Sequence, residues 1–346
     1  MSLDLEFFNR ETNITAKVVC DSVSEQGVRL TTFEIEYPRF IHGELMTHRM
    51  LSKNSSSSRA IPIQKMLDQI ESNMAIPVYW GKNKSGMQAV EEVSKFDEAK
   101  AVLNWERSYN CVKERVENMV EIGLHKQVPN RLTEPFQMMK VVITGTDFGN
   151  FFNLRIHPDA QPEICMLAYK MYKAMQESKP VELKAGEWHL PFVDKLLDEN
   201  LNLISYGVSH EDDTYGTMHS PVTLEQAIKL SAASCASVSY RTEGMTLEKA
   251  DKVFDMLIKA EVIHASPFEH LATPIVEKFD CFLDTGYEVN LPLHPDSWED
   301  GITHVNKQGV LCSGNLRGWV QYRHLLPNNT NWKFDFEQRM KLFSEH

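Results

Sequence analysis

The chain has 346 residues, of which 42% are hydrophobic and 24% charged, and its formal net charge is −12. These values are typical of a globular protein with one large domain or two ordinary ones. The negative charge argues against a nucleic-acid partner, although a local basic pocket for a small phosphorylated ligand is compatible with it. No run of about 18 apolar residues occurs and no signal peptide is recognisable, so we expect a cytoplasmic protein without a membrane partner.

The six cysteines are scattered, without a CxxC pair or a metal-like spacing. In a reducing compartment such residues are small buried hydrophobes or free thiols. We therefore expect neither disulfides nor a metal site.

Two strand-like runs, residues 14–19 and 28–37, flank a turn-like segment and predict a β-hairpin. After them, residues 46–59 contain a histidine, two arginines, an asparagine and five serines, where a strand gives way to an irregular segment. Such a density of polar groups in a loop held by a strand is typical of a ligand site. A solvated serine-rich linker is the alternative, but planar side chains capable of directed hydrogen bonds argue against it.

Helical spacing of apolar residues predicts a helix over residues 63–70 and a long amphipathic helix over 95–123, which Gly123 ends. Residues 76–86 between them have loop composition, and Trp80 there is interpreted as a buried aromatic more readily than as a cover for a ligand.

A short helix ending near Pro135 and a β-branched strand over residues 138–144 follow. Arg131 lies just before this strand, and it is either a surface charge or a ligand arginine.

Residues 164–175 show a clean apolar stripe of helical spacing, with Asp159 as the expected N-cap. Arg155 precedes this helix and is flanked by Phe151 and Phe152. If Arg155 is buried it needs an anion or several acceptors, because an unpaired charge in apolar surroundings is costly.

The acidic region over residues 194–220 is mixed in character, and 208–216 within it is interpreted as an exposed loop or linker. Helices are predicted over residues 224–237 and 247–260. The tail after residue 324 is expected to be peripheral.

Three separated blocks resemble the flavin-dependent thymidylate synthases. Residues 47–59 are similar to the family's Arg-His-Arg signature with its following Ser, Asn and Ser-x-Arg, and residues 150–164 match its Asn, Leu-Arg and Ala-Gln-x-Glu-Ile block. Residues 236–240 and 266–270 resemble a block usually found at the family's N-terminus. The order is therefore circularly permuted, or the chain carries a rearranged duplicate, because residues 321–324 also resemble the start of the signature.

Two positions depart from the signature. Thr47 stands where the family has its first arginine, and Ser55 stands where it usually has an acid. Either Arg323 supplies the missing cation from the displaced half, or the substrate or reaction differs from the standard one.

The resemblance implies an α+β fold with a central mixed or antiparallel sheet flanked by long amphipathic helices. Residues 1–193 would form the main flavin- and nucleotide-binding region, and residues 194–346 would complete the same fold. A homo-oligomer, either a dimer or a tetramer, is also implied.

The implied activity is that of a methyltransferase, a flavin-dependent thymidylate synthase that converts dUMP to dTMP. Methylenetetrahydrofolate would donate the one-carbon unit, and FAD reduced by NADPH would carry the hydride. A classical synthase with a cysteine nucleophile is unsupported, since no cysteine follows a proline. The alternatives are a flavin- or folate-dependent pyrimidine-nucleotide hydroxymethyltransferase and a non-catalytic nucleotide-binding relative.

The resemblance also implies roles for individual residues. Arg155 would be catalytic, because an arginine in a dry pocket stabilises the negative charge that develops over N3 and O4 of the uracil. The flavin-binding residues would be Thr47, His48, Arg49, Asn54, Ser55, Asn150 and His270. The substrate-binding residues would be Glu44, Ser57, Ser58, Arg59, Arg131, Arg155, Gln321 and Arg323. His48 and Arg49 would act as cations or donors beside the flavin, and His270 is expected in the same pocket as His48.

Overall fold

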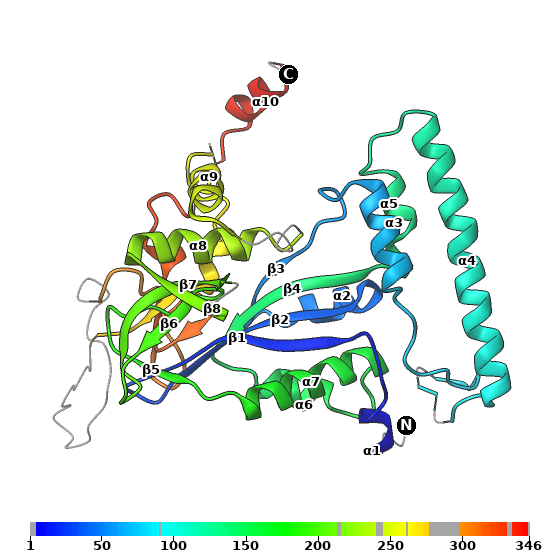
Figure 1. The fold of residues 1–346 in the computed structure, drawn as a ribbon, viewed down its shortest axis with the longest axis horizontal. Coiled ribbons are helices and arrows are strands. Elements are labelled where there is room, and N and C mark those ends of the chain that lie inside the picture. Colours follow the sequence, from blue (N-terminus) through cyan, green and yellow to red (C-terminus); the bar gives the residue numbers. More distant parts are fainter. Residues whose placement is uncertain are drawn as a thin grey trace.

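A five-stranded mixed sheet forms the centre of the computed structural model (Figure 1). The structure describes residues 5–86, 88–89, 91–212, 216–239, 245–260, 262–276, 298–330 and 334–344. The strand order is β3-β4-β2-β1-β5. The strands are β1 (Thr15–Ser24), β2 (Arg29–Pro38), β3 (Ser52–Ser55), β4 (Met138–Gly145) and β5 (Val181–Leu183).

The hairpin of β1 and β2 is confirmed, and Gly27 at φ 78° makes its tight turn. Antiparallel pairs continue from β2 to β4 and from β4 to β3, whereas β5 lies parallel to β1. The sheet is therefore mixed and flanked by helices, so the predicted α+β fold class is confirmed.

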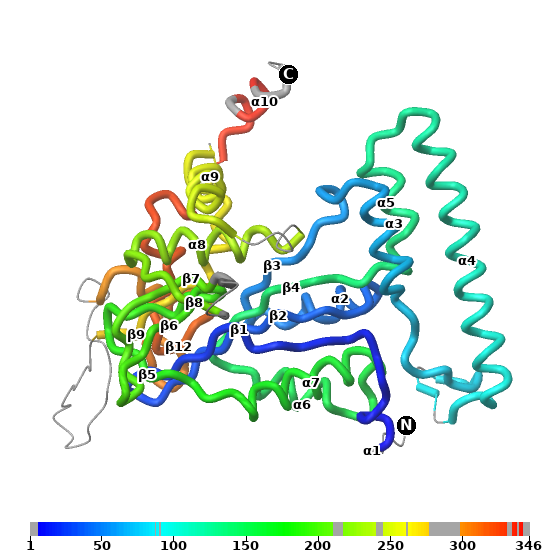
Figure 2. Tube along the Cα trace, viewed as in Figure 1, coloured from blue at the N-terminus to red at the C-terminus, as the bar shows by residue number. Residues whose placement is uncertain are grey.

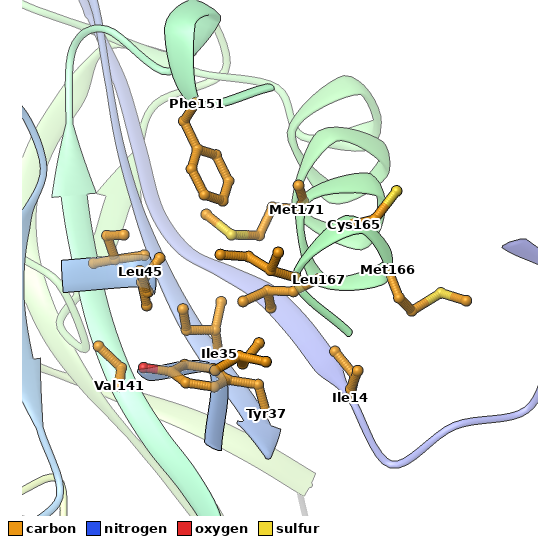
Figure 3. Close-up of a cluster of buried hydrophobic side chains, with 14 of the residues drawn as sticks. Ile14, Ile35, Tyr37, Leu45, Val141, Phe151, Cys165, Met166, Leu167 and Met171 are labelled. Carbon is orange, nitrogen blue, oxygen red and sulfur yellow. The ribbon is translucent and has the colours of Figure 1, made fainter. Parts of the chain in front are cut away.

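The apolar face of this sheet packs against two helices, α6 (Gly149–Arg155) and α7 (Pro162–Glu177) (Figures 1 and 2). Figure 3 shows Ile35 and Val141 from the sheet and Leu167 and Met171 from α7 in this core. The stripe predicted for residues 164–175 is buried at Ile164, Leu167, Ala168 and Met171, but Tyr172 near its end is exposed, contrary to the prediction.

Two details of the prediction for α6 and α7 are wrong. Residues 149–155 are themselves helical, so Arg155 ends α6 and does not merely precede a helix. The N-cap of α7 is Gln161 and not Asp159. The reason is Pro162, whose fixed φ and missing N–H suit the first helical position.

A second group of helices stands beside the sheet and has its own apolar cluster. Its members are α3 (Ile63–Ser72), α4 (Lys95–Glu121), α5 (Pro129–Leu132) and η2 (Glu134–Phe136). The short helices η1 (Arg39–Ile41) and α2 (His42–Met46) instead contribute Ile41 and Leu45 to the core of the sheet, and α1 (Leu5–Phe8) lies at the N-terminus. The predicted helices over 63–70 and 95–123 are confirmed, and Gly123 at φ 80° follows the end of α4. Trp80 is half-buried and makes an edge contact with Trp105.

The polar face of the sheet is covered by the region after residue 183. Its elements are β6 (Asp194–Leu197), β7 (Leu203–Asp212), β8 (Gly216–Val222), α8 (Leu224–Ala236), α9 (Leu247–Ile258), η4 (Ser266–His270), β9 (Ala272–Pro274), β10 (His304–Val305), β11 (Leu311–Ser313), β12 (Leu316–Arg317), β13 (Trp319–Gln321), η6 (Tyr322–Leu325) and α10 (Phe336–Ser344). The helices predicted over 224–237 and 247–260 are α8 and α9. The division into regions 1–193 and 194–346 stays a prediction.

Two loop predictions are corrected. Residues 208–216 are not an exposed loop or linker, because β7 and β8 form an antiparallel hairpin there, with residues 213–215 outside the described part. The cluster over residues 46–59 is not irregular throughout, because β3 pairs with the edge of β4. In both cases backbone pairing, which serine-rich or acidic sequence does not reveal, creates the strand.

Among the described cysteines, Cys20, Cys111, Cys165, Cys235 and Cys312 are not joined in disulfides, and Cys281 lies outside the described residues. Within the described ranges, none of the helices is both long and apolar enough to cross a membrane. Those ranges also contain no cluster of three or more His, Cys, Asp or Glu side chains suited to a metal ion.

Candidate functional site

Arg155 joins two of the blocks that carried the resemblance. From the end of α6 its Nη1 lies 2.7 Å from Glu44 Oε2, and its Nε donates to His48 Nε2 at 2.9 Å. Its Nη2 makes only longer contacts, at 3.5 Å to the Glu44 carbonyl and 3.4 Å to Thr47 Oγ1. The Arg155 side chain is 19% exposed, so this largely buried cation has the anion and acceptors that we expected.

His48 is a neutral hydrogen-bond donor. Because Nε2 accepts the hydrogen bond from Arg155, the ring hydrogen lies on Nδ1. Burial, helped by the charges of Arg155 and Lys53, lowers the pKa of His48 to about 4. Of the two roles expected for this side chain, cation or donor, the cation is wrong, since a protonated ring would turn an N–H toward the Arg155 Nε–H.

Lys53 is a cation of this region that sequence reasoning overlooked. Its Nζ donates to the carbonyls of His48 and Leu51, the latter at 2.8 Å. Burial lowers the pKa of Lys53 to about 8, and the Glu269 carboxylate opposes that shift. The signal was available, because a lysine six positions after Thr47 adds a charge to a block that lacks its first arginine.

The displaced third block lies against β3 and β4, at the sheet edge that also carries the signature block. His270 is fully buried in η4, and its Nδ1 lies 2.7 Å from Thr144 Oγ1 on β4. Thr144 is paired with Ser52, the first residue of β3. The segments are therefore brought together as the resemblance implied, while a pocket shared by His48 and His270 stays a prediction.

Gln321 and Arg323 reach the same edge from the end of the chain. Arg323 pairs with Glu269, and its buried Nε has no hydrogen-bond partner in the described part of the chain. Gln321 Nε2 donates to the Glu269 carbonyl at 3.0 Å and to Asn315 Oδ1 at 3.2 Å. Asn315, which sequence reasoning missed, also receives a 3.1 Å hydrogen bond from Ser52 Oγ, so it ties the two ends of the chain together.

Asn54 and the serines after it differ in accessibility. Asn54 Oδ1 is a buried acceptor without a partner among the described residues, and Ser55 is half-buried. Ser57 is exposed and donates its backbone N–H to Ser239, whereas Ser58 is buried.

A cavity of about 220 Å³ lies beside these serines. Its lining includes Ser56, Ser58, Ser239, Arg39 and Lys140, so hydroxyl and cationic groups face the same space. The residue next to Ser239 in the third block, Tyr240, lies outside the described residues.

Six predicted contact residues are solvent-exposed: Thr47, Arg49, Ser57, Arg59, Arg131 and Asn150. None of the three arginine side chains forms an ion pair or hydrogen bond with another described residue. They are therefore accessible to an anionic ligand, and for Arg131 both readings, surface charge and ligand, stay open.

Comparisons with known proteins bear on this site. Residues 21–181 match the family model described as thymidylate synthase complementing protein, a stretch that contains the first two blocks. No curated protein matches the chain.

Among solved structures, the chain is similar to a UMP/dUMP methylase, PolB from Streptomyces cacaoi, bound with 5-Br UMP. That likeness has 19% identity and a TM-score of 0.42, and it covers 48% of this chain and 90% of that one. The same methylase bound with 5-Br dUMP gives 18% identity and a TM-score of 0.41, over 48% of this chain and 92% of that one.

The family model carries the conclusion, because it contains the residues that form the contact of Arg155 with Glu44 and His48. It confirms the predicted resemblance and the methyltransferase-type enzyme class. Residues 21–181 of the chain are therefore similar to the thymidylate synthase complementing protein family.

Proposed function

We propose that the chain is a flavin-dependent thymidylate synthase, which methylates C5 of dUMP with methylenetetrahydrofolate as donor and NADPH as reductant. The observation that carries the proposal is the contact of Arg155 with Glu44 and His48, which unites two signature blocks inside the family-matched residues. A lone block could occur by chance, but here a largely buried guanidinium from one block is held by His48 of the other block and by Glu44.

The residues of the signature block fit a flavin ring. His48 offers an Nδ1–H, Arg49 is an exposed cation, and Asn54 Oδ1 is a buried acceptor without a described partner. A flavin ring has carbonyl acceptors, an imide N–H and, when reduced, negative charge, so this set of two donors and one acceptor complements it. Bound there, FAD would supply the hydride chemistry that no amino-acid side chain provides.

Arg155 is suited to bind and stabilise the uracil ring. Glu44 and His48 hold Nη1 and Nε at short distances, which fixes the plane of the guanidinium. The weakly engaged Nη2 can then donate to a uracil oxygen. A donor fixed before the reaction in a largely buried place stabilises developing negative charge without reorganising.

The nucleotide phosphate has a separate set of donors. Arg59 and Ser57 are exposed beside the buried Ser58, and planar guanidinium groups bind phosphate oxygens in pairs. Arg155 is therefore not needed for the phosphate.

A second candidate is hydroxymethylation of the same nucleotide, with water in place of hydride. The observation that favours it concerns Thr47, which stands at the position where the family has an arginine. The Thr47 hydroxyl lies 3.4 Å from Arg155 Nη2. A hydroxyl at that point is able to hold a water molecule, which an arginine would displace.

The proposal is tested by flavin binding. The double variant His48→Ala with Asn54→Ala should lose FAD, measured by the yellow absorbance retained after gel filtration and by its bleaching with NADPH. A matched double variant at exposed positions, His125→Ala with Asn200→Ala, should bind FAD as the wild type does. Unchanged FAD affinity in the first double variant would refute the flavin site.

A further inference from the structure

A continuous row of polar side chains crosses the polar face of the central sheet and ends at His270. In order, the row consists of Lys195, Ser22, His189, Thr32, Thr144 and His270. Apart from Lys195, which is half-buried, these side chains are fully buried. Neither the family match nor the proposed chemistry explains why hydroxyl and imidazole groups should fill the middle of a core.

The backbone holds the row in place. Ser22, Thr32 and Thr144 lie on the neighbouring strands β1, β2 and β4, and Thr32 is directly opposite Thr144 in the register. The backbone of His189 is fixed by an antiparallel bridge to Ala272, in which the backbone N–H of His189 donates to the Ala272 carbonyl at 2.8 Å. Each hydrogen bond in the row therefore joins groups whose positions the sheet sets.

The charge at one end determines the direction of the first hydrogen bonds. Lys195 Nζ lies 2.6 Å from Ser22 Oγ, and an ammonium group can only donate. The hydroxyl hydrogen of Ser22 must then find an acceptor, and among the described residues His189 Nδ1, at 2.9 Å, is the one within reach. His189 therefore carries its own hydrogen on Nε2.

The same donor-to-acceptor direction continues through the remaining hydrogen bonds as far as His270. His189 Nε2–H donates to Thr32 Oγ1 at 2.8 Å, so the Thr32 hydroxyl donates to Thr144 Oγ1 at 2.6 Å. The Thr144 hydroxyl in turn donates to His270 Nδ1 at 2.7 Å. His270 must then bear its hydrogen on Nε2.

The opposite direction is unfavourable at the charged end. It would leave the buried Ser22 hydrogen without an acceptor, which is costly in a buried place. It would also place two donors, a His189 N–H and the Lys195 ammonium group, on the same Ser22 oxygen. Burial and the nearby charge of Lys195 lower the pKa of His189 well below its usual value, so this ring stays neutral and has a single hydrogen to place.

We propose that Lys195 and His189 are positioning residues, which act through Ser22 and the two threonines to hold His270 as the Nε2–H tautomer. The third block would thereby present a hydrogen-bond donor of fixed direction, and only the identity of its acceptor, a flavin or its substrates, rests on the proposed function. Lys195 and His270 stand at opposite ends of the row, so Lys195 acts on that ring through the hydrogen bonds between them.

The test is ¹⁵N NMR of histidine-labelled protein without flavin or nucleotide, so its result is independent of the proposed function. The His270 signals are identified by their loss in His270→Asn. In the wild type, Nδ1 should show the shift of an unprotonated, hydrogen-bonded nitrogen and Nε2 that of a protonated one. A His270 with its hydrogen on Nδ1 would overturn the proposal.

Variants then examine the row itself. Lys195→Met should raise the population of the Nδ1–H tautomer of His270 roughly tenfold or more, because the ammonium group then no longer competes with a His189 N–H for the oxygen of Ser22. Lys17→Met, at an exposed lysine on β1, should leave the His270 signals unchanged. Thr144→Val should abolish the bias and Thr144→Ser should retain it, which keeps the proposal testable if Lys195→Met is poorly folded. An unchanged His270 tautomer in both Lys195→Met and Thr144→Val would refute it.

Discussion

The two faces of the central sheet are built for different purposes. The face toward α7 is lined by side chains such as Phe33, Ile35 and Ile143, all fully buried. The opposite face presents Thr32 and Thr144 from the same two strands. Burial of each large apolar side chain contributes about 1.5–3 kcal/mol, whereas a typical hydrogen bond contributes about 1 kcal/mol net. The apolar face therefore supplies stability, and the polar face mainly fixes directions.

The largest effect is expected on the apolar face. Phe33→Ala should lower the free energy of unfolding by about 3–5 kcal/mol, because Phe33 is fully buried and packs against Phe148, with 5.3 Å between the two ring centroids. Urea denaturation measures this change. A loss below about 1 kcal/mol would contradict the claim that the apolar face supplies most of the stability, since the two faces would then contribute similar free energies of unfolding.

The next effect concerns turnover rather than stability. Arg155→Lys keeps the charge but loses the planar fork that contacts Glu44 and His48, so turnover should fall on the order of 10²-fold. Arg115→Lys on the exposed surface of α4 is the matched control and should be neutral. Near-normal turnover with salt-dependent weakening of nucleotide binding would instead make Arg155 a phosphate clamp.

Much of the apolar architecture was predictable from sequence. The alternation in β2, the stripe of α7 and the spacing in α4 each reflect a single buried side of one element, which a local pattern records. The hairpin of β7 and β8 was missed, because an acidic, largely exposed pair of strands has no such pattern.

The site was predictable only in part. The resemblance brought Arg155, His48 and Glu44 into one proposal, and the structure places them in contact. The row through His189 could not be predicted from the sequence, because His189 and Ser22 are 167 positions apart. A threonine in a strand is also explained by its preference for β-structure alone. The direction of a hydrogen bond depends on its partners in space, which no spacing along the chain encodes.

A smaller loss is expected on the polar face. Thr32→Val keeps the shape but leaves His189 Nε2–H without its acceptor and Thr144 Oγ1 without its donor, so the free energy of unfolding should fall by about 1–3 kcal/mol. Thr32→Ser restores the hydroxyl and should recover most of that loss in the same urea experiment. Equal stability of the valine and serine variants would show that these hydrogen bonds contribute nothing.

The smallest effect is a pH dependence from His48. Its pKa is lowered to about 4 in the folded protein, while the unfolded chain titrates near 6.5. As pH falls from 6.5 to 4, the unfolded chain binds a proton at His48 while the folded protein does not. The free energy of unfolding that His48 contributes above pH 6.5 is therefore lost over this range. We expect this contribution to be at most about 2 kcal/mol, and His48→Gln should flatten that part of the stability profile. A stability that rises on acidification through this window because of His48 would contradict the assigned tautomer.

The most direct test of the proposed function is the product formed from dUMP. The purified protein with FAD, NADPH and methylenetetrahydrofolate should convert dUMP to dTMP, identified by chromatography and mass spectrometry, and omission of NADPH should abolish the product. Formation of 5-hydroxymethyl-dUMP, or binding of dUMP and FAD without any turnover, would contradict the assignment as a thymidylate synthase.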